Sequence, residues 1–168
     1  KRPFGAGSFQ VYVTKTRVGL EAWNSVGSIL HDGKKHDNLQ WIHVCWVYSS
    51  SAGTSQLYVN GKLHSVEKRT NSGPIKGATI IKRSNFRIAT WPPEAGQDAF
   101  LGMVDEVMVF DVALNAEQIV NLERGQKKAL PTGLIAYWNF DGGDAADLSG
   151  NGRDAELAGP AEIIRLKK

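Results

Sequence analysis

The sequence contains a single cysteine, Cys45, which excludes an internal disulfide. Cys45 stands inside an apolar run, residues 41–48, and no nearby residue type would lower its pKa. We therefore expect a buried packing thiol rather than a nucleophile. Because an extracellular domain of bacterial type need not use disulfides, the single cysteine does not indicate whether the protein is intracellular or extracellular.

The chain also lacks a long hydrophobic run and a strong excess of charge of one sign. No apolar stretch approaches the roughly 20 residues that span a bilayer. The first residues lack the apolar core of a signal peptide, so we expect any such signal to lie upstream. The 20 lysines and arginines are set against 17 aspartates and glutamates and are spread along the chain. We therefore expect neither nucleic-acid binding nor membrane insertion.

Most of the sequence has the pattern of short strands. The residue types of 9–13 alternate with a period of two, as they do in a half-buried strand. Residues 41–48 are apolar on both faces, which predicts a central strand buried on both sides. Asn60 and Gly61 separate two alternating runs, and this pair strongly indicates a hairpin because a type I′ turn needs two positive φ angles. The run 103–110 predicts a further strand.

One helix interrupts the strands near residues 115–124. Asn115 can cap its N-terminus, and Gln118 completes the capping box three residues later. Ile119 belongs to a narrow apolar stripe, and Gly125 ends the helix. Because so short a helix is marginal alone, we expect it to pack on a sheet.

Three spaced segments, residues 41–44, 57–63 and 100–110, resemble the laminin-G-like jelly-roll domains of the concanavalin A-like lectin/glucanase superfamily. In that family the last segment is the final strand, and a short helix follows it. The resemblance covers about residues 1–126. It implies an all-β fold, a two-sheet antiparallel jelly-roll sandwich with one short helix near 115–124.

After a polar linker at residues 127–132, residues 133–168 resemble the first strand and first loop of a following repeat. The chain thus resembles a sandwich without its first strands, followed by the front of the next repeat, as in a tandem array divided out of register. Because strand 134–140 is apolar at nearly every position, we do not expect it to stay free in water. We expect it to pair with 103–110 and complete the same sandwich, within the chain or by exchange with a neighbouring chain. The short linker favours closure within the chain.

The loop after that strand carries the one metal-like pattern of the sequence. Oxygen-bearing side chains alternate at Asp147, Ser149 and Asn151, as ligands do in a calcium loop of EF-hand type, but no helices flank them. The alternative is an Asx-turn loop, in which Asp147 and Asn151 bond their own backbone. The family resemblance implies calcium as a cofactor, and both interpretations stay open. The candidate calcium ligands are Asp147, Ser149, Asn151, Asp105 and Asp141.

Catalysis finds little support in the pattern of carboxylates. Glucanases that share this jelly roll carry paired carboxylates on one strand for a retaining mechanism. Asp105 and Glu106 are adjacent, so in a strand they face opposite sides of the sheet and cannot act on one bond. We therefore expect that the protein is not an enzyme.

Three aromatic residues are candidates for ligand binding, because rings near loops or on outward strand positions can stack on a sugar: Tyr12, Trp23 and Trp91. The commoner role of tryptophan is core packing. The resemblance implies a non-catalytic binding module of a secreted or cell-surface multidomain protein, which recognises carbohydrate or an extracellular protein partner. The alternatives are a purely structural spacer repeat and the accessory domain of a glycoside hydrolase.

Overall fold

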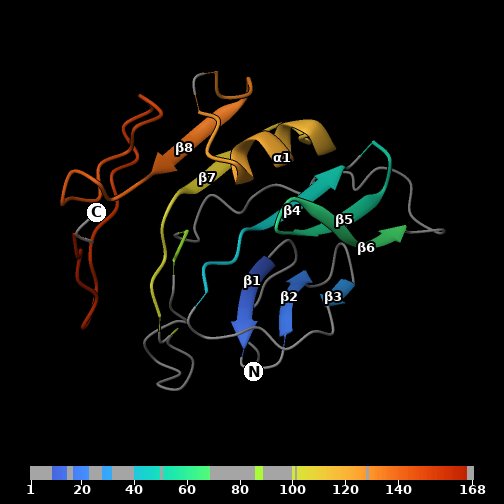
Figure 1. Ribbon diagram of the computed structural model, residues 1–168, viewed down its shortest axis with the longest axis horizontal. Coiled ribbons are helices and arrows are strands. Elements are labelled where there is room, and N and C mark those ends of the chain that lie inside the picture. Colours follow the sequence, from blue (N-terminus) through green and yellow to red (C-terminus); the bar gives the residue numbers. More distant parts are fainter. Residues whose placement is uncertain are drawn as a thin grey trace. The chain divides into compact units, whose positions relative to one another are not determined.

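The computed structural model describes the chain in several stretches: residues 9–14, 17–22, 28–31, 40–49, 51–68, 86–88, 100, 102–127 and 129–165. These residues form eight strands and one α-helix (Figure 1). The chain divides into two compact units, and each is described by itself. The first unit is Lys1–Phe86 with Ala113–Ala129, and the second is Arg87–Val112 with Leu130–Lys168.

The first unit begins with a three-stranded antiparallel sheet in the order β1-β2-β3. Its strands are β1 (Phe9–Thr14), β2 (Arg17–Ala22) and β3 (Ser28–His31). Leu20 lies opposite Val11 on one side and opposite Leu30 on the other. The strand predicted from the alternation in residues 9–13 is therefore confirmed.

A second three-stranded antiparallel sheet of the first unit has the order β4-β5-β6. Its strands are β4 (Val44–Ser49), β5 (Thr54–Val59) and β6 (Lys62–Lys68). Asn60 and Gly61 join β5 to β6 with φ angles of 49° and 70°. Positive φ at both positions is what the Asn-Gly pair predicted.

Helix α1 spans Ala116–Glu123 and belongs to the first unit. The side chain of Asn115 accepts the N–H of Gln118, and the side chain of Gln118 accepts the N–H of Asn115, both at 2.9 Å. The predicted capping box is therefore confirmed. Gly125 follows the helix with a φ of 69°, as a C-terminal stop does. Within the described residues, no helix is long and apolar enough to cross a membrane.

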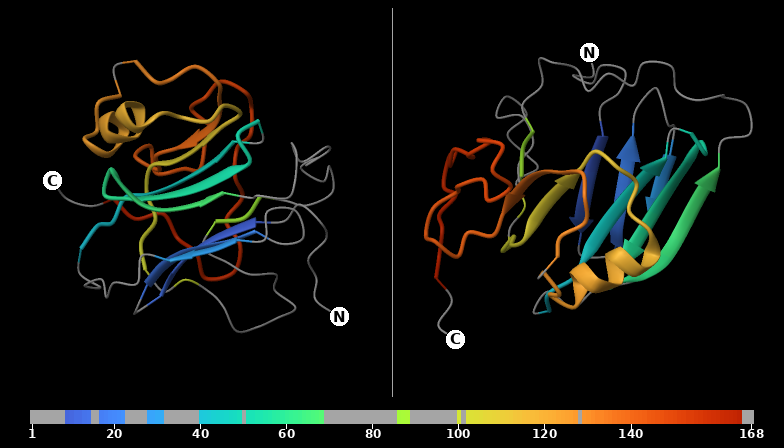
Figure 2. Two further views of the ribbon diagram at one scale, coloured as in Figure 1. Left: turned by 90° about the vertical axis from the view of Figure 1, so that its right-hand side faces the viewer. Right: turned by 90° about the horizontal axis from the view of Figure 1, so that it is seen from above.

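The two sheets of the first unit contact each other through β3 with β5 and β6, and through β2 with β5. Figure 2 shows them as two layers, with α1 on the other face of the β4-β5-β6 sheet. Leu57 and Val59 are buried, and Ile42, Val44 and Trp46 pack against them. The all-β sandwich of antiparallel sheets with one short helix is therefore confirmed.

The strand predicted at residues 41–48 differs from the expectation. Strand β4 begins only at Val44, and Trp41 before it is 57 % exposed. Within the described residues β4 pairs with β5 alone, so β5 rather than β4 lies between two neighbours. The prediction of a fully buried strand over residues 41–48 is wrong, since Trp41 faces water and most of β4 is only half-buried.

The second unit contains a two-stranded antiparallel ribbon of β7 (Val107–Phe110) and β8 (Leu134–Trp138). Val109 lies opposite Ala136, and the last three residues of β8 are buried. The predicted pairing of the late apolar strand with the strand before the helix is confirmed, and it forms within the chain. That residues 133–168 begin a further repeat stays a prediction.

Strand β7 is shorter than the predicted 103–110. Glu106 has a φ of 58°, a left-handed conformation that interrupts a strand. The Oδ1 atom of Asp105 accepts the N–H of Glu106 at 2.8 Å, a local bond that competes with strand pairing. As a result, Met103 and Val104 lie outside the strand and are exposed.

Candidate functional site

The metal-like pattern lies in the loop after β8, and the carboxylate of Asp147 is at its centre. Its Oδ1 atom accepts the N–H groups of Tyr137 and Ser149, both at 3.0 Å. Its Oδ2 atom accepts the hydroxyl of Ser149 at 2.9 Å and the N–H of Arg153 at 3.0 Å. Each oxygen of this carboxylate therefore accepts two donors.

These hydrogen bonds control the pKa of Asp147. Burial by itself raises the pKa of the carboxyl group. The bonds from Tyr137, Ser149 and Arg153 stabilise the charged form, and together they hold the pKa of Asp147 well below its ordinary value. The carboxylate therefore stays ionised, and stays an acceptor, in mild acid.

Ser149 and Asn151 belong to the same network. The hydroxyl of Ser149 accepts the N–H of Asn151 at 3.3 Å and its Nδ2 group at 3.0 Å. Nδ2 of Asn151 also donates to the carbonyl of Ile135 at 3.2 Å. The structure thus brings together the three alternating residues that the sequence selected, around the end of a strand.

A calcium ion would need the oxygen lone pairs that these donors already occupy. Both oxygens of Asp147 are used, and Asn151 turns its amide N–H group, not its oxygen, toward the strand. Ca²⁺ binds six to eight oxygen ligands, and donor hydrogens do not serve it. In this form the loop does not fit a calcium site and has the geometry of the hydrogen-bonded turn. Calcium binding by the protein stays a prediction for experiment.

The other two candidate ligands have different partners. Oδ2 of Asp141 accepts the side-chain amide of Asn139 at 3.2 Å, and Asp105 bonds the N–H of Glu106. Within the stretches that the structure describes, no three histidine, cysteine, aspartate or glutamate side chains gather as metal ligands. The described geometry therefore gives Asp105 and Asp141 local structural roles.

Glu106 is tied to strand β8. Its Oε2 atom accepts the hydroxyl of Tyr137 at 2.7 Å. Asp105 is exposed while Glu106 is half-buried, so these neighbours lie in different environments. The left-handed backbone of Glu106 places its side chain where a regular strand would not, and adjacency in the sequence did not predict this contact.

The aromatic candidates fall largely outside the described residues. Tyr12 lies on β1 opposite Gly19, but its side chain is outside the described part, as are Trp23 and Trp91 altogether. Their role in ligand binding stays a prediction.

One exposed ring that the sequence analysis missed is Trp41. It is 57 % exposed, and the exposed Gln40 precedes it. The available signal was its position at the boundary between a polar stretch and an apolar run, where an amphipathic indole can face water.

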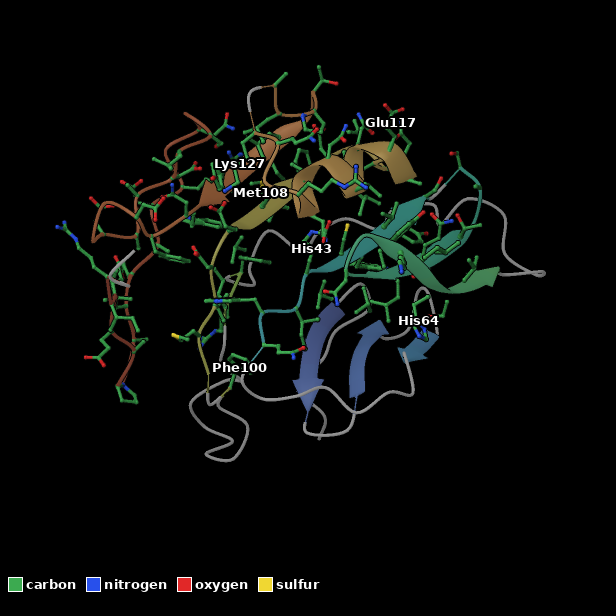
Figure 3. The ribbon with its side chains drawn as sticks, in the orientation of Figure 1. His43, His64, Phe100, Met108, Glu117 and Lys127 are labelled. Atoms are coloured by element: carbon green, nitrogen blue, oxygen red, sulfur yellow. The ribbon has the colours of Figure 1, made fainter. Side chains whose placement is uncertain are left out.

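His43 joins the start of β4 to the hairpin turn of the same sheet. Its N–H donates to Oδ1 of Asn60 at 3.0 Å, and its carbonyl accepts the N–H of Asn60 at 2.8 Å. Its Nδ1 atom is buried without a hydrogen-bond partner among the described residues. Burial lowers the pKa of His43, while the negative charge of Glu123 on α1 opposes this shift. In Figure 3 His43 and His64 lie well apart, so they form no ligand pair.

Cys45 lies opposite Tyr58 in the β4-β5 pair. Burial raises the pKa of the Cys45 thiol to about 11. The thiol is therefore protonated at neutral pH, as expected for a packing group rather than a nucleophile.

Comparison with known proteins places this architecture in context. The model of the family described as the concanavalin A-like lectin/glucanases superfamily matches residues 2–120. The chain is similar to a solved structure of a "putative carbohydrate binding protein" from Bacteroides ovatus, at 20 % identity and a TM-score of 0.55, over 82 % of this chain and 39 % of that one. It is also similar to an S-layer domain-containing protein from Clostridium thermocellum, at 22 % identity and a TM-score of 0.41, over 64 % of this chain and 50 % of that one.

The chain therefore spans half or less of the length of these two solved proteins. No curated protein matches it. At these identities the Bacteroides structure bears on the fold alone, and the family match bears on most of the chain.

Proposed function

Because the chain belongs to the concanavalin A-like lectin/glucanase superfamily, we propose that it is a non-catalytic module that binds carbohydrate. The observation that carries this proposal is the family match over residues 2–120, which agrees with the two-sheet sandwich of the first unit. The Bacteroides ovatus structure, whose name describes a "putative carbohydrate binding protein", supports the same class of ligand.

The absence of catalysis is part of the proposal, since the superfamily name covers glucanases as well as lectins. A retaining glycosidase holds two carboxyl groups about 5 Å apart on either side of the bond that it cleaves. Here Glu106 bonds the hydroxyl of Tyr137, and Asp105 bonds the N–H of Glu106. Both side chains serve the local structure, which supports binding rather than hydrolysis.

We place a candidate sugar contact at Trp41. An indole offers an apolar face for the C–H face of a sugar ring and an N–H donor for its hydroxyl groups. The exposed amide of Gln40 stands beside it in the chain. Ile42, the next residue, packs against the core and anchors the backbone that carries the ring. Tyr12, Trp23 and Trp91 stay predicted contacts of the same ligand.

A glycan array probed with and without a chelator tests this function. We expect the chain to bind a defined set of glycans, and Trp41→Ala to weaken that binding by about fivefold, because one stacked ring contributes on the order of 1 kcal/mol. Leu63→Ala is the matched control, since Leu63 is 49 % exposed and carries no ring. An array on which the chain binds no glycan in either condition would favour the structural spacer.

We further propose that the module belongs to a secreted or cell-surface multidomain protein, with carbohydrate or an extracellular protein as its partner. The support for a carbohydrate partner is the family, whose description includes lectins. Fractionation of cells that express the full-length protein tests the location. Recovery from the cytosol alone would contradict it.

A further inference from the structure

Strand β8 has two hydrogen-bonding edges, and β7 occupies one of them. In an antiparallel ribbon, successive residues direct their N–H and C=O groups to alternate sides. Tyr137 directs both groups away from β7, toward the loop that follows. Its N–H donates to Oδ1 of Asp147 at 3.0 Å, and its carbonyl accepts the N–H of Leu148 at 2.8 Å.

The same edge continues two residues earlier at Ile135. Its carbonyl lies within hydrogen-bond distance of three side-chain donors: Nη1 of Arg153 at 2.7 Å, Nδ2 of Asn151 at 3.2 Å and Oγ of Ser149 at 3.3 Å. The register between β7 and β8 shifts beside Ile135, yet its carbonyl faces the same loop as the groups of Tyr137, so these donors stand where the N–H group of a further strand would stand. A strand would supply one donor there.

Residues 147–153 achieve this without forming a strand. Gly150 and Gly152 have φ angles of 82° and 68°, which fold the segment into turns. The side chains that reach β8 nevertheless come from every second residue, Asp147, Ser149, Asn151 and Arg153, as they would from a strand. Asp147 also accepts the N–H groups of Ser149 and Arg153, and these bonds stabilise the conformation of the segment itself.

We propose that residues 147–153 form an edge cap on β8, and that without this cap β8 pairs with the β8 strand of a second copy of this chain. A strand with an open edge and an apolar, β-branched or aromatic sequence is a template for pairing. Strand β8 reads Leu-Ile-Ala-Tyr-Trp and its last three residues are buried. A second copy fits because two identical edges can pair antiparallel about a two-fold axis, with each satisfying the other.

The low pKa of Asp147 agrees with a permanent cap. A carboxylate that stays charged in mild acid keeps accepting the N–H of Tyr137 there, so the edge stays covered across the ordinary pH range.

The test compares Asp147→Ala with Asp144→Ala in the full chain. Asp144 lies in the same loop and accepts the local N–H of Ala146 at 3.2 Å, so it is a matched control away from β8. Hydrogen exchange at the Tyr137 amide and the mass in solution, from analytical ultracentrifugation, are the two readouts. In Asp147→Ala we expect at least tenfold faster exchange of the Tyr137 amide in dilute solution. At higher concentration we expect a dimer in which this amide is protected again. Asp144→Ala should match the unmodified chain in both readouts.

Each outcome decides the proposal. A folded Asp147→Ala chain that stays monomeric at all concentrations overturns it. A dimer in which the Tyr137 amide still exchanges fast also overturns it, because the contact then lies elsewhere. Where Asp147→Ala does not fold by circular dichroism, the double variant Asn151→Ala/Arg153→Ala decides instead. It removes two donors to Ile135 but keeps the Asp147 bond to Tyr137, so it uncovers only the Ile135 end of the edge. It should form a weaker dimer at higher concentration with the Tyr137 amide protected throughout; a monomer overturns the proposal. No sugar is involved, so the test is independent of the carbohydrate function.

Discussion

The two units use the same dipeptide, Asn-Gly, in opposite ways. In the first unit Asn60 and Gly61 both take positive φ angles and turn the backbone from β5 into β6. In the second unit Gly152 has a positive φ but Asn151 does not, and the side chain of Asn151 bonds the carbonyl of Ile135 on β8. Both asparagine side chains bond a neighbouring segment, since Oδ1 of Asn60 accepts the N–H of His43. The difference lies in the backbone, because alternating runs on both sides of Asn60 and Gly61 make a hairpin, whereas Asn151 and Gly152 follow a single strand.

This contrast extends to how the units hold their strands. In the first unit, sheets of three strands pack on one another, with Leu57 and Ile119 fully buried. In the second unit, a ribbon of two strands is completed by side-chain hydrogen bonds from a loop. The comparison teaches that polar side chains can take the place of a neighbouring strand, here on the edge of β8 that no other described strand pairs with.

The largest expected effect is in the apolar core of the first unit. Leu57→Ala should lower the free energy of unfolding by about 2–5 kcal/mol, because it leaves a cavity where the side chain is fully buried. Leu63→Ala, at a position 49 % exposed, should change it by less than about 0.5 kcal/mol. Urea denaturation measures both. Equal losses in the two variants would contradict the assigned core.

The next effect is in the polar network of the second unit. Asp147→Ala should lower the free energy of unfolding by about 1–3 kcal/mol, since the N–H of Tyr137 loses its acceptor beside a buried strand. Asp144→Ala, which removes one local bond, is the control. Denaturation in dilute solution, where no dimer forms, measures the difference. Equal free energies of unfolding in the two variants would mean that the hydrogen bonds of Asp147 do not stabilise this unit.

A smaller effect on stability is expected from a change of pH, and it again differs between the two units. Burial lowers the pKa of His43 in the folded chain, so the unfolded chain binds more protons below about 6.5 and stability should fall as the pH drops through that value. For Asp147, whose folded pKa is lowered, the contribution is complete above about 4 and is lost only in stronger acid. Melting temperatures at pH 7 and pH 5 test this. His43→Gln should flatten the slope.

The smallest expected effect is that of calcium. Because donors occupy both oxygens of Asp147, we expect millimolar calcium added to chelator-treated protein to leave the melting temperature nearly unchanged. A clear rise that Asp147→Ala abolishes would support the calcium site predicted from the alternating oxygens, and it would mean that the loop rearranges to bind the ion.

Several features followed from local sequence. The Asn60-Gly61 turn and the Asn115-Gln118 capping box depend on residues within four positions of each other, so the sequence predicted them in detail. The pairing of β8 with β7 was also predictable, because an apolar strand must be covered and the family topology offered one partner.

The candidate site was predicted only in part. The sequence selected Asp147, Ser149 and Asn151 as a group, and the structure brings them together. It did not predict their partners, since Tyr137 and Ile135 belong to a strand that alternation alone does not orient toward a loop.

Sequence by itself determined the class of fold, the hairpin turn, the helix cap and the need of an apolar late strand for a partner, because each depends on local conformation or on the removal of apolar surface from water. Tertiary structure decided the rest. Among the described residues it placed β5 between two strands, exposed Trp41, started β7 only after Glu106 and set the carboxylate of Asp147 against the edge of β8. These outcomes depend on which donors and acceptors meet across the fold, and a carboxylate accepts an N–H or binds a cation according to the neighbours that the fold brings to it.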